Sequence, residues 1–173
     1  MIEVLVADIT TLDTDAIVNA ANSALGGGGG VDGAIHRAAG PSLAKASRAL
    51  APCLPGHAVI TPGFGLSARF VIHAVGPVWS GGDRGEPALL RRTYERAFAL
   101  ALANGRIRSI AVPAISTGVY RFPKPLAAEI ATEVMRRYER SFDRVVACLF
   151  DEESAAHYRR LLGPDPSAAR PLP

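Results

Sequence analysis

The chain has few cysteines, few aromatic residues and no long hydrophobic run. Its two cysteines, Cys53 and Cys148, lie far apart and neither belongs to a CxxC or Cys/His cluster, so the sequence predicts neither a disulfide framework nor a metal site. No apolar run approaches the roughly 18 residues of a membrane helix. The first residues lack the basic region and cleavage site of a signal peptide. We therefore expect a cytoplasmic protein that has no membrane span.

Positive charge is present, but its arrangement does not favour a nucleic-acid partner. The formal net charge is +3, a sign that suits an anionic ligand. Arginine pairs at 91–92, 136–137 and 159–160 each fall within an amphipathic helical pattern, which indicates solvated helix faces. Single-stranded nucleic acids are bound by aromatic residues interleaved with charge, and aromatic residues make up only 6% of this chain.

Short apolar runs alternate along the chain with longer helical patterns. Helices are predicted to begin at about residue 31, after Glu86-Pro87 and after Pro125, with a last one over about 152–162. Residues 63–67 join two predicted strands without room for a helix, so that pair is expected to be antiparallel. The predicted strands are 2–6, 16–20, 58–61, 70–75, 109–113 and 144–150.

This order of elements predicts an α/β fold. A length of 173 residues suits one domain with a sizeable core. We expect a three-layer α/β/α sandwich with a central mixed sheet of about six strands. The domain is expected to span 1–163, and residues 164–173, rich in proline and small side chains, are expected to form a disordered tail.

The most informative segment is a run of five glycines, 26–30, between a strand and a helix. Asn19-Ala20-Ala21-Asn22 precedes it and Val31-Asp32-Gly33 follows it. Glycines let the backbone approach a ligand closely, and the helix start adds a positive dipole end, so the segment predicts a phosphate-binding loop. Neither a P-loop nor a Rossmann fingerprint fits the spacing. A flexible linker is the alternative, but linkers rarely join a strand to a helix inside a small domain.

A second loop follows the strand at 109–113. It reads Ile115-Ser116-Thr117-Gly118-Val119-Tyr120, and small or hydroxyl residues at the carboxyl end of a strand can hold another phosphate. Tyr120 and Phe122 would give a flat wall for a sugar or base. Taken alone, this loop is equally well explained as an ordinary strand-to-helix turn.

Together these motifs resemble the macrodomain family, and most closely its branch that hydrolyses O-acetyl-ADP-ribose and protein-linked mono-ADP-ribose. The resemblance runs from Val6-Ala7-Asp8-Ile9-Thr10 to the last helix and includes Val75-Gly76-Pro77-Val78-Trp79. It implies a hydrolase whose ligands are ADP-ribose or O-acetyl-ADP-ribose, with mono-ADP-ribosylated proteins as substrates and with no cofactor. We assume a monomer.

The resemblance also assigns ligand contacts. Asp8 would accept a hydrogen bond from the adenine amino group, although an aspartate there is also an ordinary turn residue. The two loops would hold the diphosphate through backbone N–H groups, and Tyr120 or Phe122 would border the distal ribose. The implied ligand-binding set is Asp8, Ile9, Asn19, Gly28, Gly29, Gly30, Val31, Ser116, Thr117, Gly118, Val119, Tyr120 and Phe122.

Asn22 and Asp32 are the predicted catalytic residues. They lie ten residues apart at the two ends of the glycine loop, so a loop folded around the ligand would bring both beside the distal ribose. Asn22 would bind a ribose hydroxyl, and Asp32 would orient or deprotonate a water molecule. Asp32 near a helix start is also a good N-cap. His36 follows one turn later on the same face, where a packed helical histidine is the favoured interpretation. Activation of the water by a substrate phosphate is an alternative to Asp32.

Three other functions share this pocket. One is a module that binds ADP-ribose without hydrolysing it, which has no need for Asn22 and Asp32. The second is a single-stranded RNA binder, and the third is a phosphatase that acts on an ADP-ribose phosphate. Two departures from the family pattern, Ala7 and Arg121 where glycine is usual, bear on rate and substrate preference rather than on fold. The natural leaving group is left open.

Overall fold

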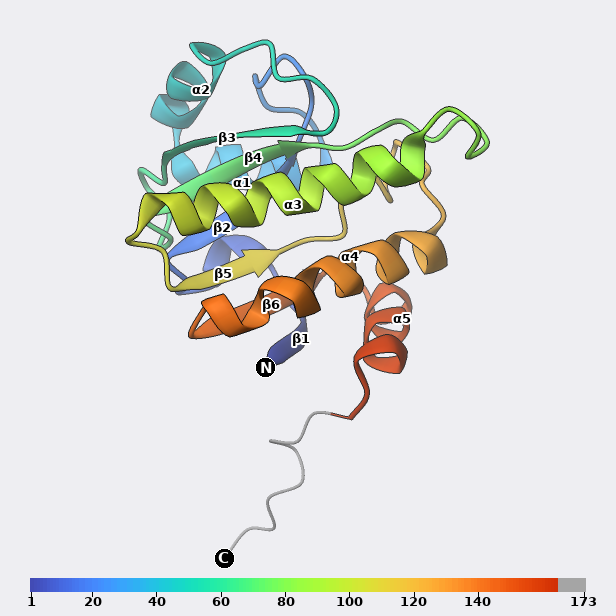
Figure 1. Cartoon of the computed structure of the whole chain (residues 1–173). Helices are drawn as coiled ribbons and strands as arrows, with labels where there is room; N and C mark the ends of the chain where they lie inside the picture. The colour runs from blue at the N-terminus through green and yellow to red at the C-terminus, as the bar shows by residue number, and fades with distance from the viewer. Residues whose placement is uncertain (165–173) are drawn as a thin grey trace, which may run out of the picture.

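The computed structural model describes residues 1–164, and the expectation of a disordered tail falls almost wholly outside them. Within this part of the chain, six strands form one sheet in the order β1-β6-β5-β2-β4-β3, with helices on both faces (Figure 1). The elements are β1 Ile2–Val6, η1 Ile9–Thr11, β2 Ala16–Ala21, α1 Gly30–Ala39, α2 Pro41–Arg48, β3 His57–Pro62, β4 Phe70–Val75, α3 Glu86–Asn104, β5 Ser109–Val112, α4 Lys124–Tyr138, η2 Glu139–Ser141, β6 Arg144–Leu149 and α5 Glu152–Leu162.

The sheet is mixed, as predicted. β1, β6, β5, β2 and β4 are parallel, and β3 pairs with β4 in antiparallel register, with Thr61 opposite Val71. The short connection between β3 and β4 allows a hairpin but not the crossover that a parallel pair requires. The antiparallel pair could therefore be predicted from the length of one loop.

The two faces of the sheet carry separate hydrophobic cores. Ile17 of β2 points to the face covered by α1 and α2, and Val18, the next residue, points to the face covered by α3, α4 and α5 (Figure 1). Both side chains are fully buried. Alternate side chains of a strand lie on opposite faces, so a strand covered on both sides is apolar at nearly every position. This explains why the central strands have continuous apolar runs.

Helix α2 was missed in the sequence analysis. Gly40, at φ +87°, ends α1 and begins α2, and Pro41 occupies the first turn of α2, where a missing N–H costs nothing. Only Leu43 and Ser47 of this helix are buried, and its 8 residues make about two turns, which is too short for a clear pattern in the sequence. α2 nevertheless positions the glycine loop, as described below. Among residues 1–164, no helix is both long and apolar enough to cross a membrane.

Candidate functional site

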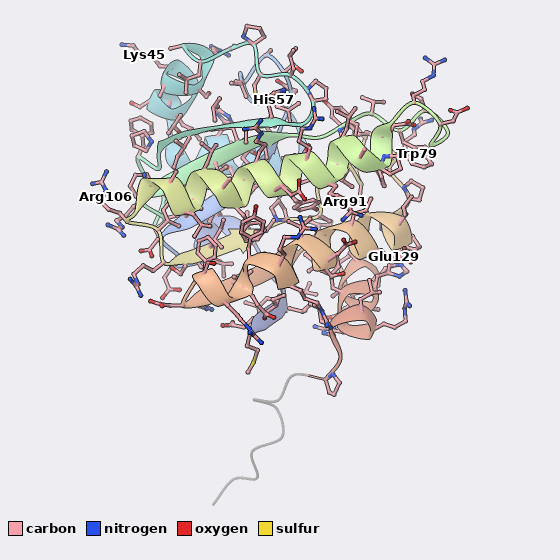
Figure 2. The ribbon with its side chains drawn as sticks, viewed as in Figure 1. Lys45, His57, Trp79, Arg91, Arg106 and Glu129 are labelled. Carbon is pink, nitrogen blue, oxygen red and sulfur yellow. The ribbon has the colours of Figure 1, made fainter. Side chains whose placement is uncertain are left out.

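The predicted site residues gather at the edge of the sheet where the parallel strands end. Because β1, β2, β4, β5 and β6 all run the same way, the loops that follow them meet at this edge. Figure 2 shows Trp79, in the loop after β4, at the end of the molecule where α3 begins, and Arg106 at the opposite end. The site is therefore assembled from segments that are far apart in the sequence.

Asn22 holds the start of the glycine loop. Its Oδ1 accepts a hydrogen bond of 3.1 Å from the backbone N–H of Leu25, and its Nδ2 donates one of 3.1 Å to the carbonyl of Gly27. Gly27 and Gly30 have φ of +89° and +56°, in the left-handed region that glycine adopts without strain. Gly28, Gly29 and Gly30 are exposed, so backbone N–H groups of this loop are open to a ligand.

Helix α2 braces the same loop from outside. The hydroxyl of Ser47 donates to the carbonyl of Leu25 over 2.6 Å, and Nη2 of Arg48 donates to the carbonyl of Gly26 over 3.2 Å. Ser47 is fully buried. These two hydrogen bonds tie the carbonyls of Leu25 and Gly26 to helix α2.

Asp32 lies in the first turn of α1 with its carboxylate directed inward. The N-cap of α1 is Gly29, so the interpretation of Asp32 as a capping residue is wrong. Its Oδ1 accepts a hydrogen bond of 2.8 Å from Nδ2 of Asn19. A methyl group placed on Gly28 would lie 3.2 Å from Oδ2 of Asp32 and 3.5 Å from Nδ2 of Asn22. The loop thus brings the two predicted catalytic side chains close to the same face of one exposed glycine.

His36 lies next to Asp32 but is not hydrogen-bonded to it. Its Nε2 is 3.3 Å from Oδ1 of Asp32, and its ring lies against Gly27. Neither ring nitrogen makes a hydrogen bond with any residue that the structure describes. The side chain is 12% exposed, consistent with the packed histidine favoured in the sequence analysis.

Asn19 lies behind Asp32 rather than on the surface of the site. Its side chain is fully buried, and its Nδ2 is also 3.2 Å from Nδ1 of His73. Burial, with a smaller contribution from His36, lowers the pKa of His73 to about 4, so this imidazole is neutral at pH 7. Asn19 is therefore placed to orient Asp32, not to meet a ligand directly.

The second loop is folded tightly against the end of β4. Ser116 has φ +67°, and its buried Oγ has no hydrogen-bond partner within residues 1–164. A methyl group on Gly76 would overlap that Oγ, so only glycine permits this approach. Thr117 is half-buried, while Gly118 and Val119 are exposed, Val119 at 91%. The exposed tip is the part of this loop that is open to a ligand.

Tyr94 of α3 fixes the base of the second loop. Its hydroxyl donates to the carbonyl of Pro113 over 3.2 Å and accepts from the N–H of Ile115 over 2.9 Å. Burial raises the pKa of Tyr94 to about 12, which keeps the phenol protonated and able to donate.

Tyr94→Phe is expected to lower the free energy of unfolding by about 1–3 kcal/mol, because the buried N–H of Ile115 loses its acceptor. ADP-ribose affinity should fall as well, since the loop behind Ser116 loosens. Chemical denaturation and calorimetric titration would measure both, with Tyr138→Phe as a control on a half-buried tyrosine of α4. Unchanged values for Tyr94→Phe would show that the loop does not depend on this hydroxyl.

Of the two aromatic residues predicted to border the ligand, one is buried. Phe122 is 2% exposed and packs edge-to-face on Trp79, with ring centroids 4.8 Å apart. Tyr120 is half-buried and accepts a hydrogen bond from the N–H of Trp79 through its carbonyl. Arg121 has φ +60°, which is the conformation that the glycine usual in the family would favour.

The loop after β4 is held rigid by a carboxylate. Glu86 accepts hydrogen bonds from the N–H groups of Ser80, Gly82 and Arg84, over 2.7–2.9 Å. Burial acts to raise the pKa of Glu86, but these backbone donors outweigh it and hold the pKa at about 2. The carboxylate therefore stays ionised and keeps Trp79 against the second loop.

The end of β1 carries Asp8, and the neighbouring strand ends in an aromatic residue that the sequence analysis missed. Asp8 is exposed, and its Oδ1 accepts from the N–H and hydroxyl of Thr10 at 3.0 and 2.7 Å, as a turn residue would. Ile9 is buried. Phe150 directly follows β6, which pairs with β1, and is 90% exposed. The sequence analysis counted Phe150 as the end of the strand, although the Asp151 that follows is the N-cap of α5.

Among the described residues, no group of three or more His, Cys, Asp or Glu side chains is arranged to hold a metal ion. The polar groups at this edge of the sheet are the backbone N–H groups of two loops, two amide side chains and two carboxylates. Such a set can bind a phosphorylated ligand and position a water molecule.

Fold and site together define a known class. The family model described as Macro domain matches residues 18–131, and the chain belongs to this family, which confirms the resemblance and the three-layer fold. The chain is 56% identical over 172 residues to an O-acetyl-ADP-ribose deacetylase of Klebsiella pneumoniae, covering 95% of this chain and 97% of that protein. It is 57% identical over 156 residues to a Macro domain-containing protein of Ralstonia nicotianae, covering 90% of this chain and 91% of that one.

Solved structures show the same architecture. The Oceanobacillus iheyensis macrodomain with ADP has a TM-score of 0.87 and 41% identity, covering 93% of this chain and 89% of that one. The Trypanosoma brucei macrodomain in complex with ADP-ribose has a TM-score of 0.85 and 39% identity, covering 94% of this chain and 69% of that one.

Proposed function

We propose that this Macro domain protein binds ADP-ribose and hydrolyses the ester of O-acetyl-ADP-ribose. The observation that carries the proposal is that Oδ2 of Asp32 and Nδ2 of Asn22 both lie within 3.5 Å of the position a Cβ of Gly28 would take. A pure binding module needs the loop but not these two groups. A relative with 56% identity is named an O-acetyl-ADP-ribose deacetylase, which supports the same reaction.

The two loops bind the diphosphate. Exposed N–H groups at Gly28–Gly30 lie at the start of α1, with half-buried Val31 next in the helix, and both the N–H groups and the helix dipole favour an anion there. The loop at Ser116–Val119 faces the same edge and receives the other phosphate. ADP is bound to the Oceanobacillus iheyensis macrodomain, a relative that shares this fold.

The adenosine end of the ligand lies over β1 and β6. Asp8 is exposed, so it can accept a hydrogen bond from the adenine amino group while it also holds Thr10, and the Ile9 backbone lies beside it. Phe150, exposed at the end of the neighbouring strand, offers a face on which the base stacks.

Phe150→Ala is expected to weaken ADP-ribose binding by about 1–3 kcal/mol, the range for one base stacked on one aromatic ring. Isothermal titration calorimetry measures this loss. Phe64→Ala is the matched control, because Phe64 is 45% exposed but lies in the β3–β4 turn at the opposite end of the sheet. Equal ADP-ribose affinities for the two variants would show that the adenine base does not stack on Phe150.

In the bound substrate, the distal ribose places its acetyl ester beside Asp32. Nδ2 of Asn22 has a second N–H beyond the one given to Gly27, and it binds a ribose hydroxyl. Asp32 accepts a proton from a water molecule as the water oxygen attacks the acetyl carbonyl carbon. The bond between that carbon and the ribose oxygen then breaks, the ribose oxygen takes the proton, and the products are acetate and ADP-ribose. Tyr120 borders this ribose, with Phe122 packed behind it.

The same site serves a larger substrate. The link between ADP-ribose and an aspartate or glutamate side chain is also an acyl ester of the distal ribose, so we extend the proposal to mono-ADP-ribosylated proteins. Gly118 and Val119 at the exposed tip leave room for a protein on the acyl side. We propose further that residues 1–163 act as one cytoplasmic, monomeric domain, and size-exclusion chromatography with light scattering would test the monomer.

Acetate release from O-acetyl-ADP-ribose, followed with purified protein, tests the proposed function. Label released from a protein automodified on glutamate tests its extension to protein substrates. Tight binding of ADP-ribose with no release from either ester would identify a binding module instead. Binding of oligo-adenylate that weakens steeply with salt would identify an RNA binder.

A further inference from the structure

A chain of buried hydrogen bonds runs from Asp32 away from the ligand loops to the edge of the sheet. Asn19 Nδ2 lies 2.8 Å from Oδ1 of Asp32 and 3.2 Å from Nδ1 of His73. His73 Nε2 lies 2.9 Å from the hydroxyl of Thr61, which lies 3.1 Å from the carbonyl of Pro62. Asn19 and His73 are fully buried and Thr61 is 4% exposed. The chain crosses β2, β4 and β3, and its far end belongs to the antiparallel strand.

The donors along this chain can point in only one consistent direction while Asp32 is ionised. A carboxylate only accepts, so Asn19 must present its NH₂ group, and the second N–H of that group then points to Nδ1 of His73. Nδ1 is therefore the acceptor and the ring proton sits on Nε2, from where it is donated to Thr61. The one proton of the Thr61 hydroxyl goes to the carbonyl of Pro62.

These residues have no simple packing role. Their neighbours in β2 and β4 are apolar, and Oδ1 of Asn19 has no hydrogen-bond partner within residues 1–164. An unpartnered buried oxygen costs stability that an apolar side chain in the same place would not. These buried polar residues cost stability and direct one N–H at Asp32. Their role therefore lies in the site and not in packing.

We propose that Asn19, His73 and Thr61 are positioning residues that hold the carboxylate of Asp32 in its water-orienting conformation by fixing the direction of the Asn19 amide. This inference rests on the proposed hydrolase function. The titratable or amide groups that face Asp32 are His36 from α1, Asn22 from the glycine loop, and Asn19 from β2 with His73 of β4 behind it.

Thr61 is the place to test the chain, because two side chains, those of His73 and Asn19, separate it from Asp32. In Thr61→Val the N–H at Nε2 of His73 loses its acceptor and stays buried without a partner, so the ring is no longer held in one orientation. Nδ1 then holds the second N–H of Asn19 less firmly. The amide that donates to Asp32 is therefore less fixed, and so is the carboxylate.

The experiment compares wild type, Thr61→Val and Thr61→Ser in O-acetyl-ADP-ribose hydrolysis. We expect Thr61→Val to lower kcat about tenfold, the scale on which partners of a site residue act. ADP-ribose affinity should stay unchanged, and Thr61→Ser should restore kcat. Thr132→Val is the matched control, because Thr132 is also 4% exposed and its hydroxyl donates only to carbonyls of its own helix.

A second readout does not depend on activity. Nitrogen-15 spectra of the His73 ring in wild type should show the proton on Nε2 at pH 7. In Thr61→Val the proton should stay on Nε2, with the proton and nitrogen shifts of that N–H moved because it has lost its acceptor. A wild-type proton on Nδ1, or a Thr61→Val kcat equal to that of Thr132→Val, overturns the proposal. If the wild-type protein does not hydrolyse the ester but its His73 ring carries the proton on Nε2, the proposed function is contradicted. The direction of the hydrogen bonds would still be established.

Discussion

Asp32→Ala is expected to lower kcat for O-acetyl-ADP-ribose by about 10²–10⁴-fold, the usual contribution of a positioned base. ADP-ribose affinity should change only a few-fold, because the diphosphate is held by backbone N–H groups of the two loops. The physical reason is the position of Oδ2, which faces Gly28 and Asn22 at the open end of the loop while Oδ1 is held by Asn19. Acetate release and calorimetric titration of the same preparation would separate the two effects.

Asp32→Asn is the control variant, since it keeps the shape of the side chain and removes its basicity. The alanine variant should also lose about 1 kcal/mol of unfolding free energy, because Asn19 loses an acceptor and the first turn of α1 loses a negative charge. A residue with only a catalytic role would be dispensable for folding. Asp32 is expected to contribute to stability as well. If both variants keep the wild-type kcat, Asp32 does not activate the water, and a substrate phosphate does so instead.

Gly33→Ala is expected to destabilise the protein, although alanine normally stabilises a helix relative to glycine by about 1 kcal/mol. A methyl group on Gly33 would overlap the carbonyl oxygen of Gly28, a backbone atom that has no rotamer to escape into. We expect a loss of about 1–3 kcal/mol, as for other overpacked sites. ADP-ribose binding should weaken at least about tenfold, because a displaced Gly28 moves the phosphate-binding N–H groups out of place.

Gly29→Ala provides the comparison for stability. A methyl group on Gly29 would meet no atom of the described residues within 4 Å, and its φ of −92° suits any residue. Its unfolding free energy should therefore stay within about 0.5 kcal/mol of wild type. Thermal unfolding of the two variants isolates the contact between Gly33 and Gly28. Equal midpoints would mean that α1 does not press on the loop in solution.

Most of the fold could be predicted from local patterns. The helices show apolar residues at helical spacing, whereas the central strands are short continuous apolar runs, such as the one that contains Ile17 and Val18. The length of the β3–β4 connection determined the antiparallel pair. Helix α2 was not predictable in this way, because Leu43 is the single apolar side chain that it buries.

The site could be predicted less completely. The strand–glycine–helix pattern located Asn22, Asp32 and the phosphate loop, because glycines at that junction let several backbone N–H groups face one anion. The same pattern did not separate surface from interior, and so it grouped the buried Asn19 and Phe122 with exposed loop residues. Phe150 was missed because an aromatic residue at the end of an apolar run is equally consistent with one more buried strand position.

The sequence by itself therefore determined the layers of the fold, the antiparallel hairpin at the edge of the sheet and the two loops, because each depends on residues close together in the chain. Only the tertiary structure decided which side of Asp32 faces the ligand and which side meets Asn19, His73 and Thr61. It alone placed Ser47 against the glycine loop and Phe150 beside the end of β1. These are contacts between distant segments, and their distances are set by how strands and helices pack rather than by any period or motif.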